Sequence, residues 1–115
     1  MENSCIFCKI AAGEIPAQKV YEDDTVLAFE DIHPCAPVHV LVIPKQHVAS
    51  VMELSAQNEQ ILPALFAAIR RVAEIKGVAQ SGFRVVSNVG KDGGQSVAHL
   101  HFHVLGGRSF GESFG

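Results

Sequence analysis

The sequence predicts one small domain that combines several β-strands with a single long helix. Short apolar runs typical of strands occur in both halves of the chain, and one stretch between them changes to the period of a helix. The chain has 115 residues, of which 48% are hydrophobic and 18% are charged. This length and composition are those of one globular domain covering residues 1–115.

The composition also limits the partners and the compartment. The net charge is −3 and the basic residues are scattered, so no nucleic-acid-binding surface is expected. No apolar stretch is long enough to span a bilayer, no secretory signal is visible, and the cysteine count is odd. We therefore expect a cytoplasmic protein with no membrane association. The low charge fraction favours apolar surface hidden in a homodimer.

Cys5 and Cys8 form a C-x-x-C pair at the start of the domain. Two thiolates do not complete a tetrahedral zinc site, so distant histidines would have to supply the other ligands. His47 and His99 are the candidates, because the other early histidines lie in a turn or inside an apolar strand. The spacing fits a redox pair or two small apolar residues equally well.

The first half of the chain is predicted to form a sheet around one central strand. The expected elements are a short helical turn with a connector at residues 9–17, strands at 19–22 and 25–30, a loop at 31–37 and the central strand at 38–44. His39 is the one polar residue in that central strand. It is either a core histidine bonded to backbone or an imidazole that faces other histidines.

Residues 55–76 are predicted to form the long helix. Its apolar stripe, which we expect in the core, consists of Leu62, Leu65, Phe66, Ile69, Val72 and Ala73. Ser55 is a suitable N-terminal cap and Gly77 a suitable stop. Pro63 conflicts with a regular helix interior, so a late start or a kink is expected there.

Residues 99–104 alternate histidine with apolar side chains. On a strand, this alternation buries the apolar residues and places His99, His101 and His103 in a row on the opposite face. Half of the six histidines fall within these five positions. Such a row favours metal binding, proton transfer or nucleophilic attack on phosphorus over a merely polar strand face.

A predicted strand at residues 82–89 and a glycine-rich loop at residues 90–96 precede the histidines. The two strands are expected to form a hairpin whose loop lies beside the imidazoles. Glycines allow backbone amides to approach a phosphate closely, and Gln95 and Ser96 add side-chain donors.

These motifs resemble those of the histidine triad (HIT) superfamily. HLHFHVLGG is similar to the motif that names the superfamily. CIFCKI, EDDTVLAFEDI, AP-x-H-x-LVIPK-x-H and DGGQSVAHLHFHVLGGR resemble the Hint branch rather than the fragile-histidine-triad branch. The resemblance extends from Cys5 to Arg108. It implies an α+β fold with an antiparallel sheet of about five strands and two helices, and a homodimer joined across the long helix and an edge strand.

The resemblance also implies an activity, hydrolysis of the P–N bond of purine nucleoside phosphoramidates to a nucleoside monophosphate and an amine. The attacking imidazole, which would carry a nucleotidyl-histidine intermediate, corresponds to His101. His99 and His103 correspond to its flanking histidines and His39 to a supporting histidine. Ser96, together with the flanking histidines, is expected to supply protons to the leaving amine.

The nucleotide-binding residues follow from the same resemblance. The phosphate-contacting positions are Asn88, Gly94, Gln95 and Ser96, together with His101 and His103. The ribose-binding carboxylate is Asp31, with Phe29 and Ile32 near the base. Some bacterial members carry zinc on a C-x-x-C pair and two histidines, which implies a structural zinc on Cys5, Cys8, His47 and His99. No cofactor is expected to be required for catalysis.

Three alternatives stay open at this point. They are a nucleotide-binding regulatory or scaffold protein with weak hydrolase activity, a dinucleoside polyphosphate hydrolase, and a zinc protein whose histidines are only ligands. The GGR ending of the motif favours the Hint branch over the second. The tail from Ser109 to Gly115 lacks the tryptophan-proline ending of animal Hint proteins, so the resemblance does not indicate the preferred leaving amine.

Overall fold

The computed structural model describes residues 4–114, and residues 1–3 and 115, including the end of the tail, lie outside the described part. Five antiparallel strands form one sheet in the order β1-β2-β3-β5-β4. The strands are β1 (Lys19–Glu22), β2 (Val26–Glu30), β3 (Val38–Pro44), β4 (Phe83–Val86) and β5 (Phe102–Gly106). The helices are α1 (Ile6–Ala11), α2 (Ile61–Ile75) and the 3-10 turn η1 (Val51–Glu53). The predicted α+β class is therefore confirmed. No helix of the described part has the length and apolar character needed to cross a membrane.

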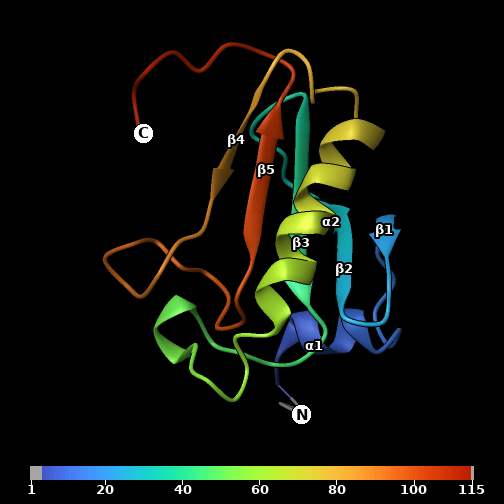
Figure 1. The fold of residues 1–115 in the computed structure, drawn as a ribbon, viewed down its shortest axis with the longest axis vertical. Coiled ribbons are helices and arrows are strands. Elements are labelled where there is room, and N and C mark those ends of the chain that lie inside the picture. The colour runs from blue at the N-terminus through green and yellow to red at the C-terminus, as the bar shows by residue number, and fades with distance from the viewer. Residues whose placement is uncertain (1–3, 115) are drawn as a thin grey trace.

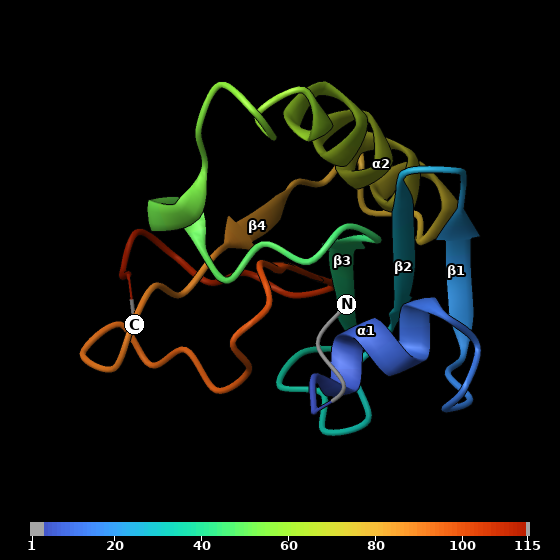
Figure 2. The same ribbon diagram turned by 90° about the horizontal axis from the view of Figure 1, so that it is seen from below.

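The two α-helices cover opposite faces of the sheet (Figures 1 and 2). Side chains of β3 alternate between the two layers: Val40 and Val42 pack with α2, whereas Leu41 and Ile43 pack with α1. Because both faces of β3 are covered, its apolar residues are continuous in sequence. This confirms residues 38–44 as the central strand. His39 lies on the α1 side, since it alternates in step with Leu41.

Helix α2 starts at Ile61, later than the predicted residue 55. Ser55 does not cap it, because its hydroxyl accepts the backbone N–H of Gln57 in a separate turn. The late start at Pro63 is confirmed: proline is the third residue of the helix, where the backbone N–H has no helical partner. The helix ends before Gly77, whose φ of 74° is the left-handed conformation that glycine adopts most easily.

The apolar stripe of α2 is narrower than predicted. Leu65, Ile69, Val72 and Ala73 are buried in the core, whereas Phe66 is 50% exposed. Phe66 lies at the edge of the helix–sheet contact, where its ring centroid is 5.6 Å from that of Phe102.

Helix α1 also differs from its prediction, because it begins before residue 9 and includes part of the C-x-x-C pair. Cys5 is its N-cap, and the Cys5 Sγ accepts the backbone N–H of Cys8 at 3.3 Å. Phe7 and Ile10 are buried against the sheet. The cysteines are thus fixed on the same face of the sheet as His39.

The predicted hairpin is confirmed by the pairing of Val85 with Val104. Both strands are shorter than expected, and β5 begins only at Phe102. His99 and His101 therefore precede the strand, and only His103 lies on it. The chain departs from the sheet here because the Leu100 N–H donates to the Val48 carbonyl, 2.6 Å away. Leu100, Phe102 and Val104 are buried, as the alternation predicted.

Candidate functional site

A cavity of about 350 Å³ opens on the α1 side of the sheet. Six of the residues singled out in the sequence line it: Phe29, Asp31, Ile32, Ser96, His101 and His103. Phe7 and Ile10 of α1 and Leu41 of β3 add an apolar wall. The sequence pattern singled out none of these three residues, because nothing in their spacing distinguishes a cavity wall from a packed interior.

His101 lines this cavity and is buried, with 3% of its surface exposed. Its Nδ1 lies 2.7 Å from the backbone oxygen of His99 and donates to it. Neutral imidazole carries one proton, so Nε2 keeps its lone pair. Every fully buried side-chain nitrogen of the described residues has a hydrogen-bond partner. Nε2 of His101 has none, so it is not fully buried and is reached from the cavity. His101 thus presents an unprotonated nitrogen to a ligand.

The backbone fixes the protonation pattern of two further histidines. His39 Nδ1 accepts the N–H of Cys35 at 3.1 Å, so its own proton lies on Nε2. That Nε2 is 2.9 Å from His103 Nδ1 and donates to it. His103 must therefore carry its proton on Nε2. His103 lines the cavity, so this N–H is a donor toward a ligand.

His103 stays neutral at physiological pH. Its burial, followed by repulsion from the neighbouring His101 and His39, lowers the pKa of His103 from 6.5 to about 4. The carboxylate of Asp31 opposes this shift only partly. At pH 7 His103 therefore faces the cavity as a neutral imidazole, which can donate a hydrogen bond without carrying charge.

Only one of the predicted residues of the glycine-rich loop, Ser96, lines the cavity. The side chains of Asn88 and Gln95 instead bond the loop itself. Asn88 Nδ2 donates to the Gly93 carbonyl at 2.7 Å. Gln95 Nε2 donates to the carbonyls of Ala49 and Val97 at 2.7 and 2.9 Å. Gly94 has a φ of 79°, which side chains other than glycine rarely adopt. These three residues shape the loop that carries Ser96.

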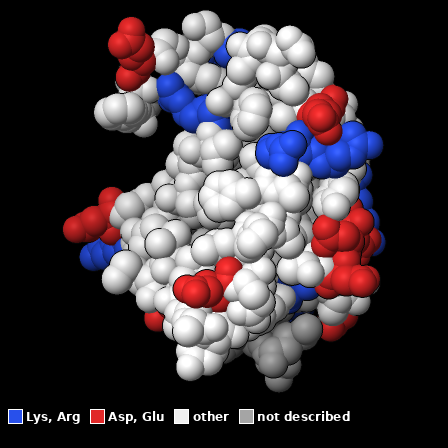
Figure 3. Space-filling view, viewed as in Figure 1, with Lys and Arg blue, Asp and Glu red and all other residues white. Residues whose placement is uncertain are grey.

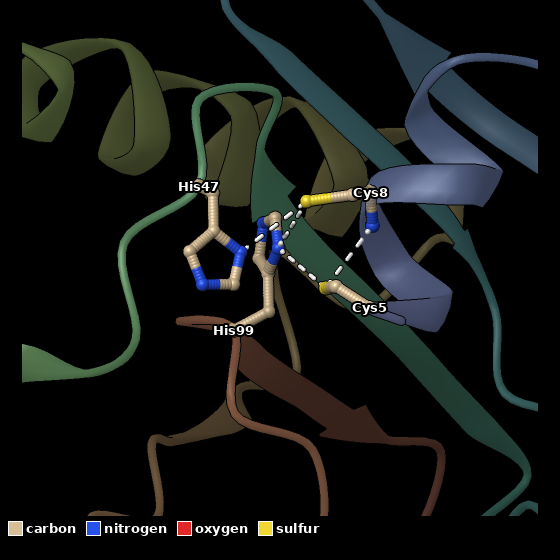
Figure 4. Close-up of side chains that lie close together, drawn as sticks. All are labelled: Cys5, Cys8, His47 and His99. Carbon is tan, nitrogen blue, oxygen red and sulfur yellow. Dashed lines mark hydrogen bonds between the residues drawn. The ribbon is translucent and has the colours of Figure 1, made fainter. Parts of the chain in front are cut away.

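Cys5, Cys8, His47 and His99 converge on one point (Figure 4). Their four ligand atoms all lie within 4.8 Å of one another. His99 Nδ1 is 3.3 Å from Cys5 Sγ and 3.5 Å from Cys8 Sγ, and His47 Nδ1 is 3.2 Å from Cys8 Sγ. Zinc bonds of about 2.3 Å to sulfur and 2.0 Å to nitrogen, at a tetrahedral angle, place these atoms about 3.5 Å apart. The cluster fits a tetrahedral zinc ion.

The protonation of His99 also suits a metal ligand. Its Nε2 donates to the carbonyl of Pro44 at 2.9 Å, which leaves the Nδ1 lone pair directed at the sulfurs. Burial is the main cause that lowers the pKa of His99 to about 4. His99 does not line the cavity, so its ring belongs to the cluster and its carbonyl serves His101. The predicted row of three imidazoles on one strand face is thus divided between two adjacent sites.

Comparisons with known proteins point to one family. The model of the HIT domain family matches residues 12–110, which leaves out Cys5 and Cys8. The purine nucleoside phosphoramidase of Escherichia coli K12 is 44% identical over 111 residues, 96% of this chain and 93% of that protein. A HIT-like protein of Synechococcus elongatus is 50% identical over 109 residues, 95% of either chain.

Two solved structures also match closely. A HIT family hydrolase from Clostridium thermocellum has a TM-score of 0.97 at 46% identity over 99% of both chains. A histidine triad protein from Clostridium difficile has a TM-score of 0.94 at 49% identity over 98% of both chains.

Proposed function

The chain belongs to the HIT domain family, and from this membership we propose that it hydrolyses purine nucleoside phosphoramidates to a nucleoside monophosphate and an amine. The family contains hydrolases, and the relative from Escherichia coli is named for this reaction. The observation that carries the proposal is the buried His101, whose proton is held at Nδ1 and whose Nε2 is open to the cavity. A protein that only binds nucleotides has no need of such a nucleophile.

The reaction proceeds in two displacements at phosphorus. The Nε2 lone pair of His101 forms a bond to the α-phosphorus, while the P–N bond breaks and its electron pair leaves on the amine nitrogen. The amine takes a proton from the hydroxyl of Ser96, which lines the cavity. Water then attacks the phosphorus and gives one proton back to Ser96, the bond to His101 breaks, and the ring nitrogen recovers its lone pair. The His99 carbonyl holds the ring throughout and accommodates its transient positive charge.

His103 stabilises the phosphoryl oxygens rather than removing a proton. Its Nε2 carries hydrogen, because Nδ1 accepts from His39, so it donates to the negative oxygens that develop in each displacement. The apolar wall of the cavity, with Phe29 and Ile32, suits a purine ring. Asp31 supplies an acceptor for ribose hydroxyls at the same opening.

We also propose that the cysteine–histidine cluster holds a structural zinc ion. Cys5, Cys8, His47 and His99 would fill all four positions of a tetrahedral site, so no position remains for substrate. A bound zinc ion would cross-link the fold. It would tie α1 to the segment after β3, which carries His47, and to the segment before β5, which carries His99. Free thiols at Cys5, Cys8 and Cys35 are typical of a reducing compartment, which supports the expected cytoplasmic location.

A homodimer through the α2 face is proposed as well. Val85 of β4 faces the α2 side, because it pairs directly with the buried Val104. It is 39% exposed, and Phe66 of α2 is 50% exposed on the same side. Figure 3 shows the α2 side of the molecule, on which most charged side chains lie toward the edges. β4 is also an edge strand, which leaves its outer hydrogen-bonding groups available to a second copy.

The assay that tests the proposed activity compares two substrates. Adenosine 5′-phosphoramidate is expected to be hydrolysed to AMP with faster turnover than diadenosine tetraphosphate. Preference for the tetraphosphate would favour a dinucleoside polyphosphate hydrolase. Tight binding of AMP without turnover of either compound would favour a regulatory or scaffold protein.

A further inference from the structure

Asp31 contacts a histidine that lies behind the cavity. Its Oδ2 is 3.3 Å from Nε2 of His39, which is only 6% exposed. Its Oδ1 accepts the backbone N–H of His33 at 2.8 Å, and its own N–H donates to the His39 carbonyl at 3.0 Å. The carboxylate is therefore held in one orientation, with one oxygen on the turn and the other directed at the His39 ring.

The proton on His39 Nε2 lies between two acceptors. His103 Nδ1 is 2.9 Å away and Asp31 Oδ2 is 3.3 Å away. The Cys35 N–H occupies His39 Nδ1, so the His39 ring cannot exchange its two nitrogens without breaking that bond. Asp31, His39 and His103 thus form a connected series in which the first and last members line the cavity and the middle one does not.

We propose that Asp31 is a positioning residue for the reaction in addition to a ribose contact: through His39, its carboxylate keeps the Nε2–H of His103 directed at the phosphoryl group. This inference rests on the proposed function for the identity of the group that His103 meets. The carboxylate fixes the tilt of the His39 ring and favours its protonated Nε2, and that proton in turn keeps His103 Nδ1 an acceptor.

The turn at His33 makes one substitution especially informative. In Asp31→Asn, the amide oxygen is retained by the His33 N–H, so the NH₂ group faces the N–H of His39. Two donors then meet at the distance of a hydrogen bond. The ring of His39 must tilt or change tautomer, and His103 loses its fixed proton.

Kinetics with two substrates separate the two roles of Asp31. A residue that acts only on the ribose raises KM for adenosine 5′-phosphoramidate and has no effect on the 2′,3′-dideoxy analogue. A positioning residue lowers kcat for both substrates, by roughly tenfold to a hundredfold. Asp24→Asn removes the same charge from an exposed turn and is the matched control, with kcat and KM expected to stay unchanged.

Nitrogen NMR of the protein labelled with ¹⁵N-histidine provides a readout that needs no substrate. The His103 ring is expected to be a single Nε2–H tautomer in the wild type and in Asp24→Asn, and a mixture in Asp31→Asn. An unchanged His103 tautomer together with an unchanged kcat on the dideoxy substrate would overturn the inference. If the wild type fails to hydrolyse phosphoramidates, the proposed function is wrong. The NMR comparison still decides whether Asp31 sets the tautomer of His103.

Discussion

The backbone oxygen of His99 lies 2.7 Å from Nδ1 of His101. One residue therefore has two tasks: its ring joins the cysteine–histidine cluster and its carbonyl sets the protonation of the neighbouring imidazole. The cluster and the cavity are distinct in space, yet they share this one residue.

Ser96→Ala is expected to reduce phosphoramidate turnover according to the leaving group. A strongly basic amine needs a proton as the P–N bond breaks, so the loss should be about tenfold or more. A weakly basic leaving group, such as an arylamine, should lose much less. Rates of amine release for a series of leaving groups provide the measurement. An equal loss for every leaving group would mean that Ser96 does not transfer the proton.

His103 should make the protein less stable in acid. Its pKa in the folded protein is about 4, below the ordinary 6.5, so between these values the unfolded chain binds the extra proton. The stability that comes from a neutral His103 is thus fully present above pH 6.5 and is lost as the pH falls through 4. Urea unfolding from pH 7.5 to pH 4 in the wild type and in His103→Gln measures it. Equal pH dependence of the two proteins would contradict the assignment.

Removal of the metal should lower the thermal stability of the protein more than its rate of hydrolysis. Purified protein is expected to contain one zinc ion per chain, and a strong chelator should lower the melting temperature while most turnover persists in the protein that stays folded. Cys5→Ser should lose the zinc. Cys35→Ser, which changes an exposed cysteine outside the cluster, should keep it. Loss of turnover in chelated protein that is still folded would argue against a purely structural ion.

Charge placed on the α2 face should dissociate the proposed dimer. Val85→Glu puts a carboxylate on the exposed side chain of the edge strand without disturbing a buried residue. Light scattering is expected to show a dimer for the wild type and a monomer for the variant. Ala12→Glu adds the same charge at the exposed C-cap of α1, on the opposite face of the sheet, and should remain dimeric. A wild type that is monomeric at micromolar concentration would contradict the proposal.

Much of the architecture was predictable because it depends on local periodicity. The run from Val38 to Pro44 indicated a strand covered on both faces, and the alternation after His99 indicated which side chains enter the core. The C-x-x-C pair with His47 and His99 was recoverable as a candidate metal-binding group because few residue types offer thiolate or imidazole ligands.

Other features depend on contacts between distant segments and leave no local pattern. His99 and His101 leave the strand because Leu100 bonds to Val48, a residue far away in the sequence. The carbonyl that holds His101 is that of His99, because the backbone turns before β5, and no sequence pattern indicated this partner.

Side-chain roles in the loop and around Asp31 were hidden for a related reason. Gln95 carries the donors that suggested a phosphate contact, and the fold uses them on the carbonyls of Ala49 and Val97. Asp31 contacts His39 only because the turn at His33 aims its carboxylate. Such choices among hydrogen-bond partners are made by tertiary structure rather than by sequence spacing.

Covalent capture on His101 tests the central claim most directly. Adenosine 5′-phosphoramidate labelled in the adenine ring is mixed with the protein, quenched during turnover and examined by peptide mass spectrometry. We predict an adenylyl group on His101 in the wild type, and no label together with a loss of turnover of about a thousandfold or more in His101→Ala. Adenylation of a different residue, or undiminished turnover in His101→Ala, would contradict the account.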